Sequence, residues 1–203
     1  MKFFLLSLAT LYTLGQAGGC LLVQPNTMGV DWKAYKTLGK IGVGGKFMAV
    51  NYTPTALEGK DFASILVGSK VEIDTQKIDS GNSGRDVTLV KFFFDKMSSG
   101  SIIATIKDIK ADKRIKGKPR TGTVQVMITM NDKSLIIPMK YSYANSKFRA
   151  EGTIDILDFD AKSALASISK SCYDLHKGKT WSDVSIGFET TIKASLCDVK
   201  ISK

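Results

Sequence analysis

The chain of 203 residues has a hydrophobic content of 43%, which is enough for one well-buried domain and gives no sign of a second. It carries a formal net charge of +10 at pH 7, with one histidine and three cysteines. It has no C-x-x-C, H-E-x-x-H or G-x-S-x-G spacing, so metal catalysis and a serine–histidine triad have almost no support. We therefore expect no metal, no cofactor and no enzyme activity.

The N-terminus has the order of an export signal. Lys2 precedes an uncharged, mostly apolar stretch, and G-Q-A at residues 15–17 supplies the small residues that a signal peptidase needs. The apolar stretch is too short for a membrane span, which takes about 20 residues. We expect residues 1–17 to be removed and residues 18–203 to form one domain in the periplasm or outside the cell. Cys20, at the end of A-G-G-C, leaves open an acylated lipoprotein as the less favoured alternative.

From residue 29 onward, apolar and polar residues alternate over eight stretches. Trp32 faces one way while Asp31 and Lys33 face the other, which is the two-residue period of a half-buried β-strand. Asn131-Asp132 and Asn145-Ser146 separate neighbouring stretches and are typical of hairpin turns. The eight predicted strands are residues 30–35, 41–49, 65–73, 102–107, 124–130, 135–143, 148–156 and 184–194.

Eight antiparallel strands joined mostly by short turns predict a closed barrel, because closure removes the exposed edges of an open sheet. A sandwich of two sheets is the alternative. In the sixth strand, Pro138 lacks an amide donor, so we expect a bulge or a broken ladder there.

Two helices are predicted between the strands. Residues 85–94, after the third strand, space Val87, Val90 and Phe94 along one face and predict a short helix that caps the barrel. Residues 161–175, before the last strand, carry an apolar stripe at helical spacing that closes one end of the barrel or lies along its wall. For this stripe, ordinary packing is favoured over a gate for a ligand.

Few polar residues are candidates for a site. His176, beside Lys177, is interpreted as a solvated surface residue. Arg85 and Asp86 could hold a ligand head group, but a charge pair that fixes the cap to the barrel rim is the favoured interpretation.

A basic segment lies between the fourth and fifth predicted strands. As a flexible hairpin loop it could attract nucleic acid, an anionic membrane surface or a pyrophosphate head group, although a role in solubility alone is favoured. The export signal makes nucleic acid improbable. Its basic residues, opposed only by Asp112, are Lys110, Lys113, Arg114, Lys116, Lys118 and Arg120.

One group of motifs is specific. I-D-T at residues 73–75, R-D at 85–86 and K-F-F-F-D at 91–95 follow one another at short spacing. Together they resemble the signature of the YceI-like family, although V-T-L follows R-D where H-L is common in the family. The resemblance implies an exported, lipocalin-like barrel that binds polyisoprenoid lipids, with Phe93 and Phe94 beside Arg85 and Asp86 in the cap.

Two functions follow for such a barrel. It either carries a long apolar lipid, of the polyisoprenoid or isoprenoid quinone type, or is filled by its own side chains and acts as an envelope structural or protein-interaction module. Small inward residues such as Gly45, Ala104, Ala150 and Gly152 favour the carrier, because they leave room inside. The residues expected to line the lumen are Trp32, Phe47, Val71, Ile128, Met139, Tyr141, Phe148 and Phe188.

Three cysteines allow three disulfide pairings. Cys20 lies near the terminus, whereas Cys172 and Cys197 flank one compact unit. We expect a Cys172–Cys197 disulfide that joins the second helix to the end of the last strand and stabilises the fold by roughly 3 kcal/mol. The sequence makes no prediction of the oligomeric state.

Overall fold

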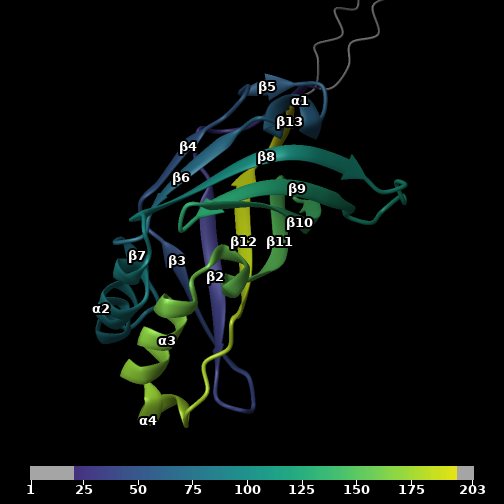
Figure 1. Ribbon diagram of the computed structural model, residues 1–203. Helices are drawn as coiled ribbons and strands as arrows, with labels where there is room; N and C mark the ends of the chain where they lie inside the picture. Colours follow the sequence, from purple (N-terminus) through teal and green to yellow (C-terminus); the bar gives the residue numbers. More distant parts are fainter. Residues whose placement is uncertain (1–20, 196–203) are drawn as a thin grey trace, which may run out of the picture.

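The computed structural model describes residues 21–195, and its main part is one curved antiparallel sheet of ten strands (Figure 1). A smaller sheet of β13 (Lys193–Ser195), β1 (Leu21–Val23) and β5 (Glu58–Gly59) lies at one end. In spatial order, the ten strands are β4 (Val50–Thr53), β6 (Lys70–Asp74), β8 (Ser101–Ala111), β9 (Arg120–Met130), β10 (Lys133–Ala144), β11 (Lys147–Asp155), β12 (Asp183–Thr191), β2 (Gly29–Lys36), β3 (Ile41–Phe47) and β7 (Ile78–Asp79). The protein is therefore mainly β, as predicted.

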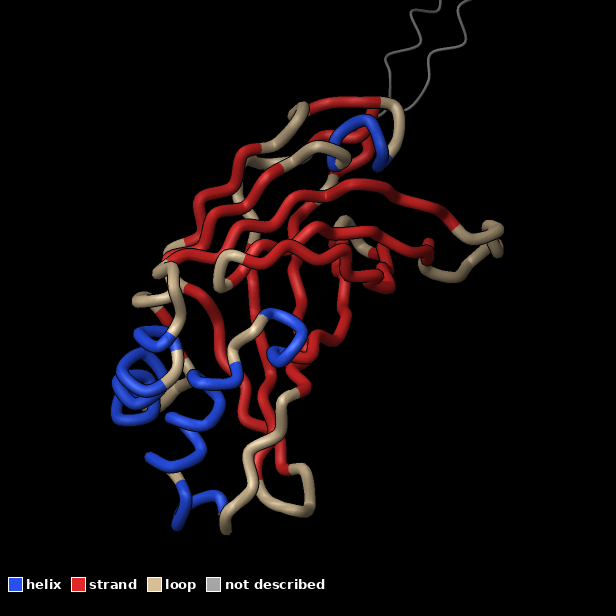
Figure 2. The backbone as a smooth tube through the Cα atoms, viewed as in Figure 1, coloured by secondary structure: helices blue, strands red, loops and turns tan. Residues whose placement is uncertain are grey.

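The two ends of the large sheet belong to the same stretch of chain. β4 is the outermost strand at one end, β3 is the last but one at the other, and only Met48 and Ala49 separate them in sequence. The amide of Met48 donates to the carbonyl of Lys77 at 2.7 Å, and the amide of Asp74 donates to that of Ala49 at 3.1 Å. The sheet consequently curls into a half-barrel, as the tube in Figure 2 shows. The large sheet has ten strands where eight were predicted, because the short β4 and β7 carry too little alternation to be recognised. It also forms a half-barrel where a closed barrel was predicted.

The helices gather at the two ends of the half-barrel (Figure 1). α1 (Phe62–Leu66) lies beside the small sheet, while α2 (Ser83–Phe92), α3 (Lys162–Ser171) and α4 (Tyr173–His176) lie at the opposite end. Two 3-10 turns, η1 (Phe94–Lys96) and η2 (Ile156–Phe159), follow α2 and precede α3. Both predicted helices exist, but α2 begins two residues early and the second helix is divided into α3 and α4.

The third predicted strand begins too early, because its first residues form α1. Asp61 caps this helix by accepting a hydrogen bond from the Ser64 amide at 2.7 Å, in a reciprocal capping box. Ile65 and Leu66 are fully buried from the helix, so their apolar pattern arose from one helical turn and not from a strand. Gly68, with φ of +90°, then turns the chain into β6.

The hairpin turns and the proline behave as the sequence predicts. Asn131-Asp132 and Asn145-Ser146 have φ between 51° and 61°, which is the left-handed geometry of tight hairpins. The ladder of β10 with β9 continues through Pro138, opposite Gln125, without a shift. The ladder with β11 covers only residues 140–144 of β10, so the predicted break lies on that side.

A charge network on the sheet joins β2, β11 and β12. Arg149 binds Asp31 through two hydrogen bonds, at 2.7 and 3.0 Å, and also lies within 4 Å of Glu151 and Glu189. Gly187 permits this arrangement, because a Cβ there would lie 2.6 Å from Nη2 of Arg149. The hydrogen bond to Asp31 and the neighbouring carboxylates raise the pKa of Arg149 above its usual value.

We expect Arg149→Met to lower the free energy of unfolding by about 1–2 kcal/mol at pH 7, since the network is partly buried. The hydrogen bond from Lys147 and, to a smaller extent, the charge of Arg149 lower the pKa of Glu189. The attraction between Arg149 and this carboxylate therefore stabilises the fold above the unfolded pKa of Glu189 and is lost as the pH falls through the folded value. The cost of the substitution should therefore shrink in acid. Urea unfolding at pH 7 and pH 3 tests this, with Lys110→Met as control, because its pair with Asp108 is exposed at 3.7 Å. Equal costs in both variants would contradict it.

Candidate functional site

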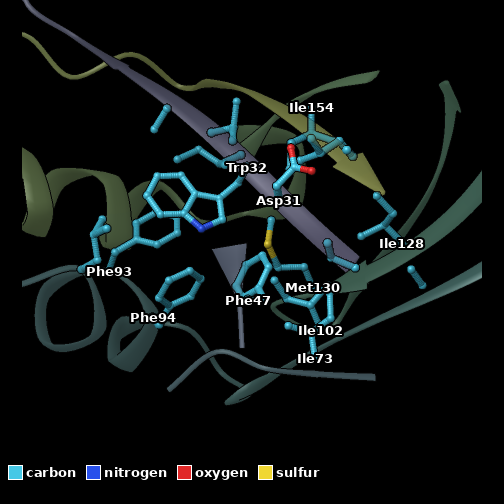
Figure 3. Close-up of a pocket in the computed structure, with 18 of the residues that line it drawn as sticks. Asp31, Trp32, Phe47, Ile73, Phe93, Phe94, Ile102, Ile128, Met130 and Ile154 are labelled. Carbon is cyan, nitrogen blue, oxygen red and sulfur yellow. The ribbon is translucent and has the colours of Figure 1, made fainter. Parts of the chain in front are cut away.

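A cavity of about 210 Å³ lies between the inner face of the half-barrel and the helices at its end. The sheet supplies one side of its wall, while α2, η1 and α3 supply the other. Figure 3 shows Phe93 and Phe94 facing a group of side chains from the sheet that includes Ile73, Ile102 and Met130. The wall is overwhelmingly apolar, which suits a long hydrocarbon chain better than a polar metabolite.

An aromatic contact attaches the helical cap to the sheet. Phe94 packs edge to face on Phe47 of β3, with ring centroids 6.1 Å apart, and on Phe93 at 5.2 Å. Asn82 caps α2 by accepting from the Arg85 amide at 2.9 Å. α2 itself has no fully buried residue, so it is held less firmly than the strands that it covers.

Six of the eight residues predicted to line the lumen do line the cavity, and two do not. Those that line it are Trp32, Phe47, Val71, Ile128, Met139 and Phe188. Tyr141 and Phe148 point into the barrel but fill its other end, where they stack at 4.9 Å. Phe62 of α1 lies between them and the small sheet, at 5.9 Å from Tyr141 and 5.2 Å from Phe148. These rings thus fill the interior beneath α1, and a second cavity, of about 350 Å³, lies beside them between α1 and the loop that joins β8 to β9. The cavity of about 210 Å³ lies beneath α2.

The small inward residues provide less room than their size suggests. The indole of Trp32 lies on Gly45, where a Cβ would come within 2.6 Å of Cζ2, and Met139 lies on Gly152 in the same way at 2.8 Å from its Cγ. Ala34 and Ala104 do border the cavity. Gly45 and Gly152 therefore each serve as a platform for a large neighbour, and it is Ala34 and Ala104 that border open space.

The predicted cap residues divide between two roles. Arg85, Phe93 and Phe94 line the cavity. Asp86 accepts hydrogen bonds from the amide and hydroxyl of Ser80 and so holds the start of α2 to the turn that precedes it. Within residues 21–195, Arg85 takes part in no ion pair, so the predicted charge pair to the rim is wrong and Arg85 is left facing the cavity.

His176 is not the solvated surface residue that the sequence predicted. It lies in the cavity wall, half-buried, with Nδ1 at 2.9 Å from the Thr180 hydroxyl. Burial, with a contribution from the charge of Lys36, lowers its pKa. Its position four residues after the buried Cys172 was the available signal, because such residues share one face of a helix. Leu175, predicted on the buried stripe, is instead exposed.

Cys172 is buried in the same wall, and burial raises the pKa of its thiol. Its predicted disulfide partner, Cys197, lies outside the described residues, as do residues 1–17 and Cys20. Strand β13, which ends at Ser195, lies beside α1, at the opposite end of the half-barrel from α3 (Figure 1). The disulfide stays a prediction that a thiol count on the native protein can test.

The basic segment forms the loop between β8 and β9, as predicted, and projects beyond the sheet in Figure 1. Every residue from Ala111 to Thr121 is exposed, including Ile115, whose apolar side chain lies between Arg114 and Lys116. The loop lies at the same end of the barrel as α1, close to Tyr141, where burial and the charge of Asp112 raise the pKa of the phenol.

Two further observations concern the described part of the chain. Residues 21–195 contain no group of three or more histidine, cysteine, aspartate or glutamate side chains arranged to hold a metal ion. Within the same residues, no helix combines the length and apolar character that crossing a membrane requires.

Comparison with known proteins identifies the family. In structure, the chain is similar to a polyisoprenoid-binding domain from Saccharophagus degradans, with a TM-score of 0.57 and 9% identity over 86% of this chain and 98% of that one. It is also similar to BcnA from Burkholderia cenocepacia, with a TM-score of 0.54 and 14% identity over 82% of this chain and 96% of that one. A search of curated proteins gives no match. The model of the YceI-like domain matches residues 23–196, and the chain therefore belongs to the YceI-like family.

Proposed function

We propose that the protein binds one long apolar lipid, of the polyisoprenoid or isoprenoid quinone type, in the cavity beneath α2 and α3, and that it carries out no reaction. The observation that carries this proposal is the cavity of about 210 Å³, whose wall is overwhelmingly apolar. Each methylene that leaves water for such a wall contributes about 0.8 kcal/mol, so a hydrocarbon chain binds there with few polar contacts. The isoprenoid class is supported by the solved Saccharophagus degradans domain, which is described as polyisoprenoid-binding.

The size of the cavity implies that the cap moves. Pockets for drug-sized ligands occupy about 300–1,000 Å³, more than the closed cavity offers. Of the two longer helices over the cavity, α2 is the more easily displaced, because α3 buries Ala164 and Ile168 whereas α2 has no fully buried side chain. A long chain would therefore enter by moving α2 outward, with Arg85 beside the entering lipid.

Both tryptophans of the chain, Trp32 and Trp181, line the cavity and can report binding. We expect a polyprenol added to delipidated protein to change the intrinsic fluorescence saturably at one lipid per chain. Mass spectrometry of an organic extract from protein purified out of its native compartment should find a lipid of this class. Protein that takes up no polyprenol and yields no extractable lipid would contradict the proposal and favour a structural or protein-interaction role.

We also propose that the protein is exported. The support is the order of Lys2, the apolar stretch and G-Q-A at residues 15–17. The intact mass of the mature protein should correspond to a chain that begins near Gly18. A mass that includes residues 1–17 would contradict export, and an added diacylglyceryl group on Cys20 would indicate a lipoprotein.

The loop between β8 and β9 is proposed to dock on an anionic membrane, where the protein could take up or release lipid. Its basic side chains attract anionic lipids at about 1 kcal/mol each, and Ile115 can enter the interface. Replacing Arg114 and Lys116 by Gln should weaken binding to phosphatidylglycerol vesicles by roughly thirtyfold in sedimentation assays. Replacing Lys91 and Lys170, at the opposite end of the molecule, removes the same charge and should have little effect. Equal losses in both variants would show that net charge alone acts.

A further inference from the structure

Trp32 places an unpaired and buried hydrogen-bond donor in the wall of the cavity. The residue is 8% exposed, and no acceptor in the described part of the chain meets its Nε1. In Figure 3, the indole nitrogen points toward the side of the cavity formed by Phe47, Phe94 and Met130. Buried donors nearly always have a partner, so an orphan in a binding cavity calls for an explanation.

The orientation of this indole is fixed by the fold. Trp32 of β2 lies opposite Gly45 of β3, and the ring lies so close to the glycine that a Cβ there would be 2.6 Å from Cζ2. Any larger residue at position 45 would push the ring away. The donor is therefore held in one direction by the backbone of the neighbouring strand.

Several other polar groups of the cavity wall are paired within the protein. The indole of Trp181 donates to the carbonyl of Thr37 at 2.8 Å, and the phenol of Tyr52 donates to Gln24 at 2.8 Å. The hydroxyls of Tyr35 and Ser185 lie 2.8 Å apart. Trp32 thus differs from its counterpart Trp181, although both rings line the same cavity.

The surroundings of Nε1 select the kind of acceptor. Its neighbours in Figure 3 are apolar, and Asp31, the adjacent residue, is bound by Arg149. Moving an anionic oxygen from water into such an apolar setting costs far more than moving a neutral one. A neutral oxygen accepts the indole hydrogen without that cost.

We propose that the cavity selects lipids that bear a neutral carbonyl oxygen, which accepts a hydrogen bond from Nε1 of Trp32, over pure hydrocarbons of the same length. This inference rests on the proposed function and adds the chemical class of the ligand. It makes Trp32 the residue that determines specificity, while the apolar wall determines the length of chain that fits.

The test uses two probes that differ at one position: farnesylacetone, and the hydrocarbon in which a methylene replaces its carbonyl. The full chain should bind the ketone about tenfold more tightly in equilibrium titrations. Trp32→Phe should bind both probes with nearly equal affinity. Trp181→Phe is the matched control, because its indole is already paired, and it should keep the tenfold preference even if both affinities change.

Nuclear magnetic resonance gives a second readout on the unsubstituted protein. With labelled tryptophan, the chain gives two indole N–H signals, and only that of Trp32 should move downfield with the ketone and not with the hydrocarbon. A preference for the ketone that survives in Trp32→Phe would overturn the inference. So would equal binding of the two probes by the full chain, which leaves the proposed function intact. Failure to bind either probe would contradict the proposed function and the inference together.

Discussion

Replacing Ala104 by Trp should weaken binding of a polyprenol by about a hundredfold. Ala104 lies on β8 between Val71 of β6 and Ile128 of β9, and all three line the cavity. An indole at this position extends into the space that the lipid needs. Losing room for three or four methylenes costs about 3 kcal/mol of binding energy, which is the hundredfold change. Retention of a radiolabelled polyprenol by the purified variant measures the effect.

The matched control is Ala144→Trp. Ala144 is exposed at the end of β10, remote from the cavity wall, so the same substitution there should leave lipid binding unchanged. Circular dichroism and the unfolding midpoint establish that both variants fold, since overpacking at residue 104 costs about 1–3 kcal/mol. A folded Ala104→Trp protein with unchanged affinity would show that the lipid binds elsewhere.

A tryptophan at Ala150 would not test lipid binding, because Ala150 faces inward but does not line the cavity. The comparison with Ala104 shows what strand alternation can and cannot predict. Trp32, Val71 and Ile128 were placed on the inner face by their two-residue period, and they do line the cavity. Ala150 and Tyr141 have the same period, but both lie at the filled end. The alternation within a strand predicts which face of the sheet a residue lies on. It does not predict which part of the barrel interior is filled by side chains from other elements, such as Phe62 of α1.

The position of Phe62 was not predicted, because the residues of α1 were assigned the two-residue period of a strand. In the sequence, Ile65 and Val67 continue the alternation of the β6 strand, so no helix was expected before it. The capping box of Asp61 and Ser64 was the local signal for α1, and that helix is what places Phe62 over Phe148. The half-barrel and the family motifs could thus be predicted, whereas the extent of the cavity depends on packing between elements distant in sequence.

Replacing Phe148 by Ala should lower the free energy of unfolding by about 3–5 kcal/mol, the largest change in stability that we expect from one substitution. Phe148 is fully buried and contacts three aromatic rings: Tyr141 at 4.9 Å, Phe62 at 5.2 Å and Phe188 at 6.2 Å. Removing the ring of Phe148 leaves a cavity that the three neighbouring rings cannot fill by moving. Guanidinium unfolding followed by circular dichroism measures the loss.

The same variant separates a structural role from a binding role. Because Phe148 is absent from the cavity wall, the polyprenol affinity of the folded molecules should change by less than about threefold. That is about 0.7 kcal/mol of binding free energy, far less than the loss in the free energy of unfolding. Phe92→Ala, at the half-buried end of α2, is the matched control and should cost only about 1 kcal/mol. If Phe148→Ala does not fold, Phe148→Leu keeps most of the volume at a cost of about 1.5 kcal/mol and permits the same comparison. Loss of lipid binding with wild-type stability would make Phe148 a ligand-binding residue and extend the cavity to the end beneath α1.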